Sequence, residues 1–198
     1  MDQVIHLFST PFQQTKLSVS ESVFKFIESQ EFLRHGNGYI THEHILECPE
    51  MKYVKDFITN RVKSYLYDTC LISDTMIPEL VTSWVNMHEK GDCSQIHVHT
   101  NSVVSGVWYL LTPENSGKLL VHNDNKLFGN LLDFPKKENI FNSNFRAFQP
   151  HSGDLILFPS NLKHSVTTSK SDQKRFSLAF NYMLRGDLSS GLTTTVKL

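Results

Sequence analysis

Two histidines, His97 and His99, stand one residue apart in the sequence QIHVHT, and a third, His164, follows in NLKHSV. Alternate side chains of a β-strand point to the same face, so the first two imidazoles would project together, about 7 Å apart along the chain. Imidazole binds Zn²⁺ and Fe²⁺, and catalytic sites of such metals usually combine three protein ligands with an open coordination position. The residue types and their spacing therefore predict a catalytic metal held by these three histidines.

Arg175, in the sequence KRFSLAFN, could bind an anion at the same metal. A guanidinium forms two parallel hydrogen bonds to a carboxylate, and its charge needs an anionic partner once it is desolvated. Ser177 would face the same way on a strand and could add a hydroxyl donor. We expect both residues to hold a carboxylate; a plain structural salt bridge would also account for Arg175.

A second His-x-His pair, His42 and His44, is a weaker candidate for a metal site. Glu43 lies between the two histidines, and the sequence offers no third ligand nearby. Because a metal site usually needs at least three protein ligands, we interpret this pair as surface residues.

The first part of the chain is predicted to form one strand and two helices that support the site. The strand is expected over residues 3–12. A capping box at Ser18 and Glu21 predicts a helix over residues 19–34. Apolar residues at three- and four-residue spacing predict a second helix over residues 49–70, and its apolar stripe should pack against a sheet.

The remainder of the chain consists of short apolar runs separated by turn-like sequences. The predicted strands cover residues 80–88, 94–99, 103–111, 118–123, 145–150, 154–159, 163–168 and 174–184. Many short strands without intervening helices favour an antiparallel sandwich or barrel, and thus a mainly β fold with N-terminal helices. The long, asparagine-rich segment 124–144 is interpreted as a lid. We expect one domain over residues 1–198, with residues 1–79 supporting a β core at 80–185.

Composition and charge narrow the classes of function. The 198 residues include 19 Lys and Arg against 20 Asp and Glu, so nothing indicates a nucleic-acid or membrane partner. No run approaches the roughly 18 apolar residues of a membrane span, and the N-terminus lacks the pattern of a signal peptide. Three scattered cysteines favour reduced thiols and a cytoplasmic protein. A homodimer remains open.

Around these residues the sequence resembles the iron- and 2-oxoglutarate-dependent oxygenases. Asn86, Gly91 and His97 match the pattern Asn-x-Tyr-x-x-Gly and His-x-Asp of the nucleic-acid demethylase branch, and the prolyl hydroxylase branch is similar. Further similar segments are Ser105-Gly-Val-Trp-Tyr-Leu, Ser116-Gly117, Gly153-Asp154 and Arg175-Phe-Ser177. The resemblance covers residues 80–185 and is closest to short bacterial and phage oxygenases with a His-x-His motif. It implies an eight-stranded double-stranded β-helix, the cupin-like jelly roll.

The resemblance also implies Fe(II) as the metal, with 2-oxoglutarate and O₂ as co-substrates. The residues implied at the 2-oxoglutarate pocket are Arg175, Ser177, Asn86, His88, Tyr109 and Asn181. Trp84, Trp108 and Tyr109 could line this pocket or simply pack in the core. The implied reaction is hydroxylation of a C–H bond with release of succinate and CO₂. The sequence does not specify whether the substrate is a small molecule, a peptide or a protein side chain.

Two positions depart from the family pattern. His88 stands where the relatives carry Tyr, and His99 stands where they usually carry Asp or Glu. Three neutral imidazoles would leave the Fe(II) charge to be neutralised by the 2-oxoglutarate dianion. His122-Asn123-Asp124 spells the usual His-x-Asp, but it follows the Ser-Gly turn instead of preceding the Trp-Tyr strand. Asp124 is therefore the weaker candidate for completing the metal site.

Three other functions could use the same residues. A cupin with a different metal-dependent activity would share Gly91, His97, His99, Gly153 and His164, although no glutamate follows His99 at the cupin spacing. A zinc hydratase or hydrolase could also use three histidines and a bound water. A non-catalytic β-sandwich binding module would hold a structural metal or none.

Overall fold

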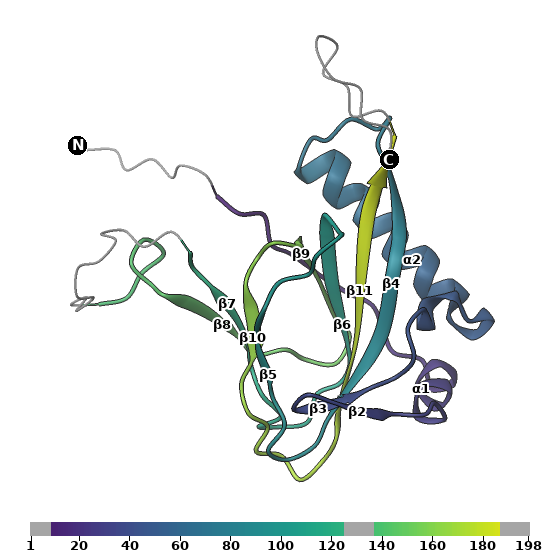
Figure 1. Cartoon of the computed structure of the whole chain (residues 1–198), viewed down its shortest axis with the longest axis vertical. Coiled ribbons are helices and arrows are strands. Elements are labelled where there is room, and N and C mark those ends of the chain that lie inside the picture. The colour runs from purple at the N-terminus through teal and green to yellow at the C-terminus, as the bar shows by residue number, and fades with distance from the viewer. Residues whose placement is uncertain (1–8, 125–136, 187–198) are drawn as a thin grey trace.

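Two antiparallel β-sheets form the body of the protein. The structure, a computed structural model, describes residues 9–124 and 137–186. The larger sheet has the order β1-β9-β6-β11-β4-β3-β2, and the smaller has the order β5-β10-β7-β8. The strands are β1 (Gln13–Lys16), β2 (Leu33–His35), β3 (Gly38–Ile40), β4 (Ile77–His88), β5 (Ser94–His97), β6 (Val104–Leu111), β7 (Leu119–His122), β8 (Phe145–Phe148), β9 (Asp154–Pro159), β10 (His164–Val166) and β11 (Arg175–Arg185). The sheets lie opposite one another (Figure 1), and the predicted jelly roll is confirmed.

The outer face of the larger sheet is apolar, and its inner face carries polar side chains beside a second apolar cluster that includes Ile156 and Phe158. Along β11, Phe176, Leu178 and Phe180 point outward and are buried. Arg175 and Ser177 alternate with them and point inward, as the period of two requires. Antiparallel pairing with β4 and β6 extends both faces across the sheet, so Asn86, His88 and Asn181 lie on the same inner face as Arg175, towards β5 and β10.

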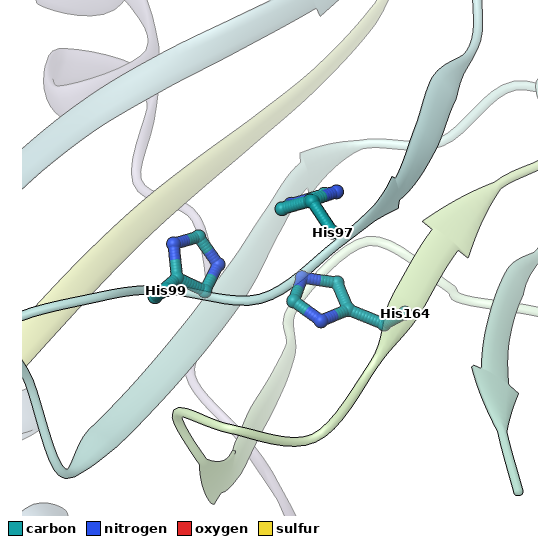
Figure 2. Close-up of side chains that lie close together, drawn as sticks. All are labelled: His97, His99 and His164. Carbon is teal, nitrogen blue, oxygen red and sulfur yellow. The ribbon is translucent and has the colours of Figure 1, made fainter. Parts of the chain in front are cut away.

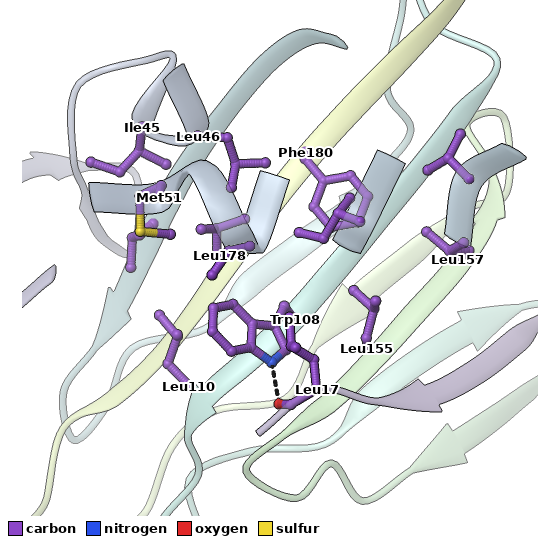
Figure 3. Packing of buried hydrophobic residues seen from close by; sticks show 14 of the residues in the cluster. Leu17, Ile45, Leu46, Met51, Trp108, Leu110, Leu155, Leu157, Leu178 and Phe180 are labelled. Carbon is purple, nitrogen blue, oxygen red and sulfur yellow. Dashed lines mark hydrogen bonds between the residues drawn. The ribbon is translucent and has the colours of Figure 1, made fainter. Parts of the chain in front are cut away.

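Helices cover the outer face of the larger sheet, as Figure 1 shows. They are α1 (Glu21–Glu28) and α2 (Lys52–Ser64), with 3₁₀ turns at Ile45–Glu47 and Pro49–Met51 and a π-helical turn at Tyr65–Thr69. The buried cluster between helices and sheet includes Met51, Trp108 and Phe180, and Trp108 donates a hydrogen bond from Nε1 to the carbonyl of Leu17 at 2.9 Å (Figure 3). Trp108 therefore packs in the core and does not line a pocket. Within the described ranges no helix is long and apolar enough to span a membrane.

Three expectations at the start of the chain and in the loop need correction or fall outside the description. Residues 9–12 are not a strand, and the first described strand begins at Gln13, after Pro11, whose missing N–H cannot join a sheet ladder. The remainder of the predicted strand, residues 3–8, and residues 125–136 of the predicted lid lie outside the described residues. Helix α1 begins later than predicted because Ser20, not Ser18, is its N-cap and accepts from the Val23 amide at 3.3 Å. It also ends earlier, at Glu28, and residues 33–34 of the predicted helix belong to strand β2.

Gly106 in β6 allows the closest packing in this core. A Cβ at this position would overlap the ring of Phe180 and lie 2.8 Å from the Ile156 carbonyl oxygen. Gly106→Ala should therefore lower the free energy of unfolding by about 3 kcal/mol, measured by urea denaturation. Combining it with Phe180→Leu should recover part of the loss, and strictly additive losses would contradict this packing.

Candidate active site

Three imidazoles from the smaller sheet converge at its inner side. His97 ends β5 and His164 begins β10, and the antiparallel register places these two residues opposite each other. His99 lies two residues beyond the end of β5, so the strand predicted over residues 94–99 is shorter than expected. One potential ligand atom of each ring lies within 4.8 Å of the others (Figure 2). Three nitrogen atoms this close could bind a single metal ion.

Backbone carbonyls orient two of these rings. His97 Nδ1 lies 2.7 Å from the carbonyl oxygen of Gln95, and His164 Nδ1 lies 2.8 Å from that of Leu162. A carbonyl only accepts, so each Nδ1 carries the proton and each Nε2 keeps a free lone pair. Hydrogen bonds of this kind commonly fix the tautomer of a metal-binding histidine.

Two histidines of the site, His99 and His164, are held neutral. Burial, reinforced by His164 and His97, lowers the pKa of His99 to about 3. Burial likewise lowers the pKa of His164 to about 4, although the Leu162 carbonyl opposes this shift. Because a metal binds only the neutral imidazole, these two rings are ready for coordination at neutral pH.

Arg175 is buried without an acidic partner. Its side chain is 2% exposed, and its Nε has no hydrogen-bond partner among the described residues. The guanidinium carbon lies 5.1 Å from the centre of the Tyr109 ring, and Nη1 donates to the Ser116 carbonyl at 3.4 Å. Burial lowers the pKa of Arg175, while Tyr109 opposes the shift. No carboxylate in the described part of the chain pairs with this cation, so a structural salt bridge does not explain it.

The other predicted pocket residues share the inner face with Arg175. His88 and Arg175 are opposite each other in the β4–β11 register, and Asn86 and Tyr109 flank Ser177. Burial, with the nearby charge of Arg175, lowers the pKa of His88 to about 4, so this ring is a neutral hydrogen-bonding group. Asn181 lies further along β11, opposite Thr82 and Ser105.

A cavity of about 730 Å³ opens in front of the histidine cluster. It is lined by His97 and His99, by the inner face of β4 and by the β2–β3 hairpin. Neither Arg175 nor Ser177 lines it. Arg175 and Ser177 are buried next to it, opposite the cavity-lining residues His88 and Asn86 in the strand register.

The alternative metal ligands lie elsewhere. His42 and His44 are exposed, as expected for surface residues. His122 Nε2 lies 2.9 Å from the Ser165 hydroxyl, and Asp124 is paired with Lys163 at 3.0 Å. Among the described His, Cys, Asp and Glu residues, His97, His99 and His164 are the group that could hold a metal.

The sequence interpretation missed several contributors to the site. Thr82 lines the open cavity, and its buried Oγ1 has no partner in the described ranges. Gly38 gives His88 its space, because a Cβ there would lie 2.6 Å from His88 Cδ2. The even-numbered phase of Trp84 and Asn86 along β4 could have identified Thr82, whereas nothing local predicts the approach of Gly38.

The residues around Arg175 fit a dicarboxylate. The unpartnered Nε of Arg175 and the buried, unpartnered hydroxyl of Ser116 offer donors in one enclosed place. The cluster of His97, His99 and His164 could hold a divalent ion that binds the other end of the same molecule. These features match the chemistry of Fe(II) and 2-oxoglutarate.

Comparison with known proteins gives the same class. A family model described as "Putative 2OG-Fe(II) oxygenase" matches residues 82–181. That match covers half of the chain, and the protein belongs to this 2OG-Fe(II) oxygenase family. No protein of curated function matches the sequence at a significant level.

Solved structures of several such enzymes share the fold. HygX from Streptomyces hygroscopicus, with nickel and 2-oxoglutarate bound, is 13% identical with a TM-score of 0.62, over 88% of this chain and 83% of HygX. A prolyl-4-hydroxylase from Pseudomonas putida is 15% identical with a TM-score of 0.56, over 90% and 95%. The epimerase SnoN from nogalamycin biosynthesis is 14% identical with a TM-score of 0.63, over 88% and 78%. At these identities the likeness concerns the fold alone.

Three histidines with lowered pKa values, His88, His99 and His164, predict that the stability of the metal-free protein depends on pH. Their folded pKa values lie below the value of about 6.5 expected in the unfolded chain, so only the unfolded chain takes up protons as the pH falls below that value. Stability should be constant above about pH 6.5 and should fall towards pH 4, by about 1.4 kcal/mol per pH unit for each such histidine. Urea midpoints across this range measure the effect. His88→Gln should make the loss of unfolding free energy per pH unit smaller. An unchanged loss would show that His88 is already charged in the folded protein.

Proposed function

We propose that the protein is an Fe(II)- and 2-oxoglutarate-dependent dioxygenase that hydroxylates its substrate. One observation carries the proposal: three imidazoles converge on the smaller sheet, and the inner face of the larger sheet carries a buried guanidinium that has no acidic partner in the described part of the chain. Family membership supports the same class of reaction. Structures of two neighbours, HygX with 2-oxoglutarate bound and SnoN in complex with Fe³⁺ and alpha ketoglutarate, are consistent with this cofactor set.

In this proposal one ring nitrogen of each of His97, His99 and His164 binds the iron. For His97 and His164 this atom is Nε2, because a carbonyl occupies Nδ1. When bound, Fe(II) with 2-oxoglutarate and O₂ supplies the oxidation, in which a C–H bond becomes C–OH and 2-oxoglutarate becomes succinate and CO₂. Arg175 binds the distal carboxylate, and Ser177 and Tyr109 can donate hydroxyl hydrogen bonds beside it. His88, being neutral, can donate from a ring N–H without adding charge.

The closed surroundings of Arg175 have a second role. Ser177, Tyr109 and His88 are all buried, so the co-substrate would lie in a compartment with little water. Electrostatic interactions are stronger in such a compartment than in bulk water. The open cavity then leaves room for the substrate on the other side of the histidines.

Anaerobic titration tests the proposal. Fe(II) and 2-oxoglutarate together should produce a visible charge-transfer band, and either one alone should not. Succinate, which lacks the keto group, serves as the control and should give no band. Tight Zn²⁺ binding combined with indifference to 2-oxoglutarate would instead favour a zinc hydratase or hydrolase.

The outcome of the oxidation needs its own measurement, since neighbours of this fold include an epimerase and a carbocyclase. With a substrate in hand, ¹⁸O₂ should place one labelled oxygen in the product and one in succinate. Label in succinate alone would retain the oxygenase and contradict hydroxylation.

A further inference from the structure

The residues that line the open cavity indicate which kind of substrate it binds, whereas the residues around Arg175 indicate only the co-substrate. We propose that it binds a small, polar substrate that carries a positive charge and hydrogen-bond acceptor oxygens, with Glu43, Thr82 and Asn181 as its specificity-determining residues. The interpretation of this ligand as the oxidised substrate rests on the proposed function. The volume of about 730 Å³ lies in the range of small-molecule sites.

Charge is the first selective feature. Glu43 is the only carboxylate lining the cavity within the described residues, and neither Lys nor Arg lines it there. Glu43 is exposed at the rim and has no ion pair among the described side chains. The Glu43 carboxylate disfavours polyanions such as nucleic acid and phosphorylated molecules at the cavity mouth and attracts an ammonium group there, while the 2-oxoglutarate dianion balances the charge of the metal.

Hydrogen-bond donors deeper in the cavity are the second feature. Asn181 Oδ1 accepts from the Ser105 hydroxyl at 2.7 Å, which fixes the amide and leaves its Nδ2–H₂ group without a partner in the described part of the chain. The Thr82 hydroxyl, directly opposite Asn181 in the register, is also unpartnered there. These groups can donate to a hydroxyl or carbonyl oxygen of the substrate.

Distance along the strand separates these donors from the co-substrate. Asn181 follows Arg175 by three inward-facing positions, or about 20 Å at the rise of a β-strand. A five-carbon diacid that binds both Arg175 and the histidine cluster does not extend that far. Asn181, grouped with the 2-oxoglutarate residues on sequence grounds, is thus better placed for the substrate.

Trp84 forms an aromatic wall and also provides a reporter. Its ring centre lies 5.8 Å from that of His99, and it lines the cavity. The chain has two tryptophans, and the other, Trp108, is buried on the opposite face of the sheet with its Nε1 bonded to Leu17. In protein labelled with 5-fluorotryptophan, one ¹⁹F resonance should therefore report the cavity and the other the core.

The experiment uses the full chain loaded with diamagnetic Zn²⁺ and 2-oxoglutarate. Three probes of similar size are titrated: the Nα-acetyl amides of lysine, glutamine and glutamate. All three carry carbonyl acceptors and they differ in charge. The Trp84 resonance should shift while that of Trp108 stays fixed. The lysine probe should bind about threefold more tightly than the glutamine probe, as expected for an exposed ion pair, and the glutamate probe should bind most weakly.

Substitutions identify the residues that are responsible for the expected differences in probe affinity. Glu43→Gln should make the lysine and glutamine probes bind equally, whereas the matched control Glu50→Gln, outside the cavity, should leave their ratio unchanged. Thr82→Val should weaken all three probes by about fivefold, and Thr82→Ser should restore binding. Tightest binding of the glutamate probe, a ratio unaffected by Glu43→Gln, or no Trp84 shift with any probe would overturn the proposal.

The charge-transfer band separates this result from the proposed function. A band without the expected probe ranking would refute the substrate class and retain the oxygenase. The expected ranking in a protein that never gives the band would retain the cavity chemistry and refute the oxygenase.

Discussion

Arg175→Leu should weaken 2-oxoglutarate binding by at least about 100-fold, because a buried charge-assisted pair contributes several kcal/mol that an apolar side chain cannot replace. The same substitution should leave the metal-free protein equally stable or more stable. Arg175 is 2% exposed and its Nε lacks a described partner, so in the absence of an anion its burial costs free energy.

Isothermal titration of the Mn²⁺-loaded protein with 2-oxoglutarate measures the first effect, and urea unfolding without ligand measures the second. Arg185→Leu is a matched control, since Arg185 lies on the same strand but pairs with Glu79 at the surface. If Arg175→Leu instead lowers the stability of the metal-free protein by several kcal/mol, Arg175 has a structural partner and is not an anion site.

His99→Asp should raise the affinity for Mn²⁺ in the absence of 2-oxoglutarate by about tenfold or more, because a carboxylate attracts a divalent ion more strongly than a neutral imidazole does. In the natural protein the three ligands are imidazoles, which bring no negative charge, and Arg175, on the inner face of the facing sheet, is cationic. The metal and the 2-oxoglutarate dianion should therefore bind interdependently, each raising the affinity for the other by the same factor.

Mn²⁺ titration followed by electron paramagnetic resonance, with and without 2-oxoglutarate, gives that factor for both forms of the protein. It should be large in the natural protein and smaller in His99→Asp. His99→Gln, which removes the imidazole without adding charge, controls for the lost ligand. Equal factors in the natural protein and the aspartate variant would contradict the neutral-site account.

Much of the fold follows from strand periodicity. All eight strands predicted after residue 80 occur, with ends that differ by a few residues. The inward phase of Arg175 and Ser177 also followed from alternation along one strand. The sequence was less informative near the start of the chain. There the N-cap at Ser20 and the break at Pro11 determine where the first helix and the first described strand begin, whereas similar patterns nearby had indicated other positions.

The site was predictable in its residue types but not in its environment. The convergence of His97, His99 and His164 was expected, although His99 lies beyond its strand. That Arg175 lacks an acidic partner is a property of the packed molecule, because it depends on every neighbouring segment. The lining of the open cavity and the role of Gly38 likewise arise from elements far apart in the sequence.

The most direct test of the central claim is an anomalous difference map from crystals grown with Mn²⁺ and 2-oxoglutarate. The account predicts one peak bound by a ring nitrogen of each of His97, His99 and His164, with a carboxylate of 2-oxoglutarate against Arg175. A peak bound elsewhere, for example at Asp124, or a His99 ring turned away from the metal would contradict it.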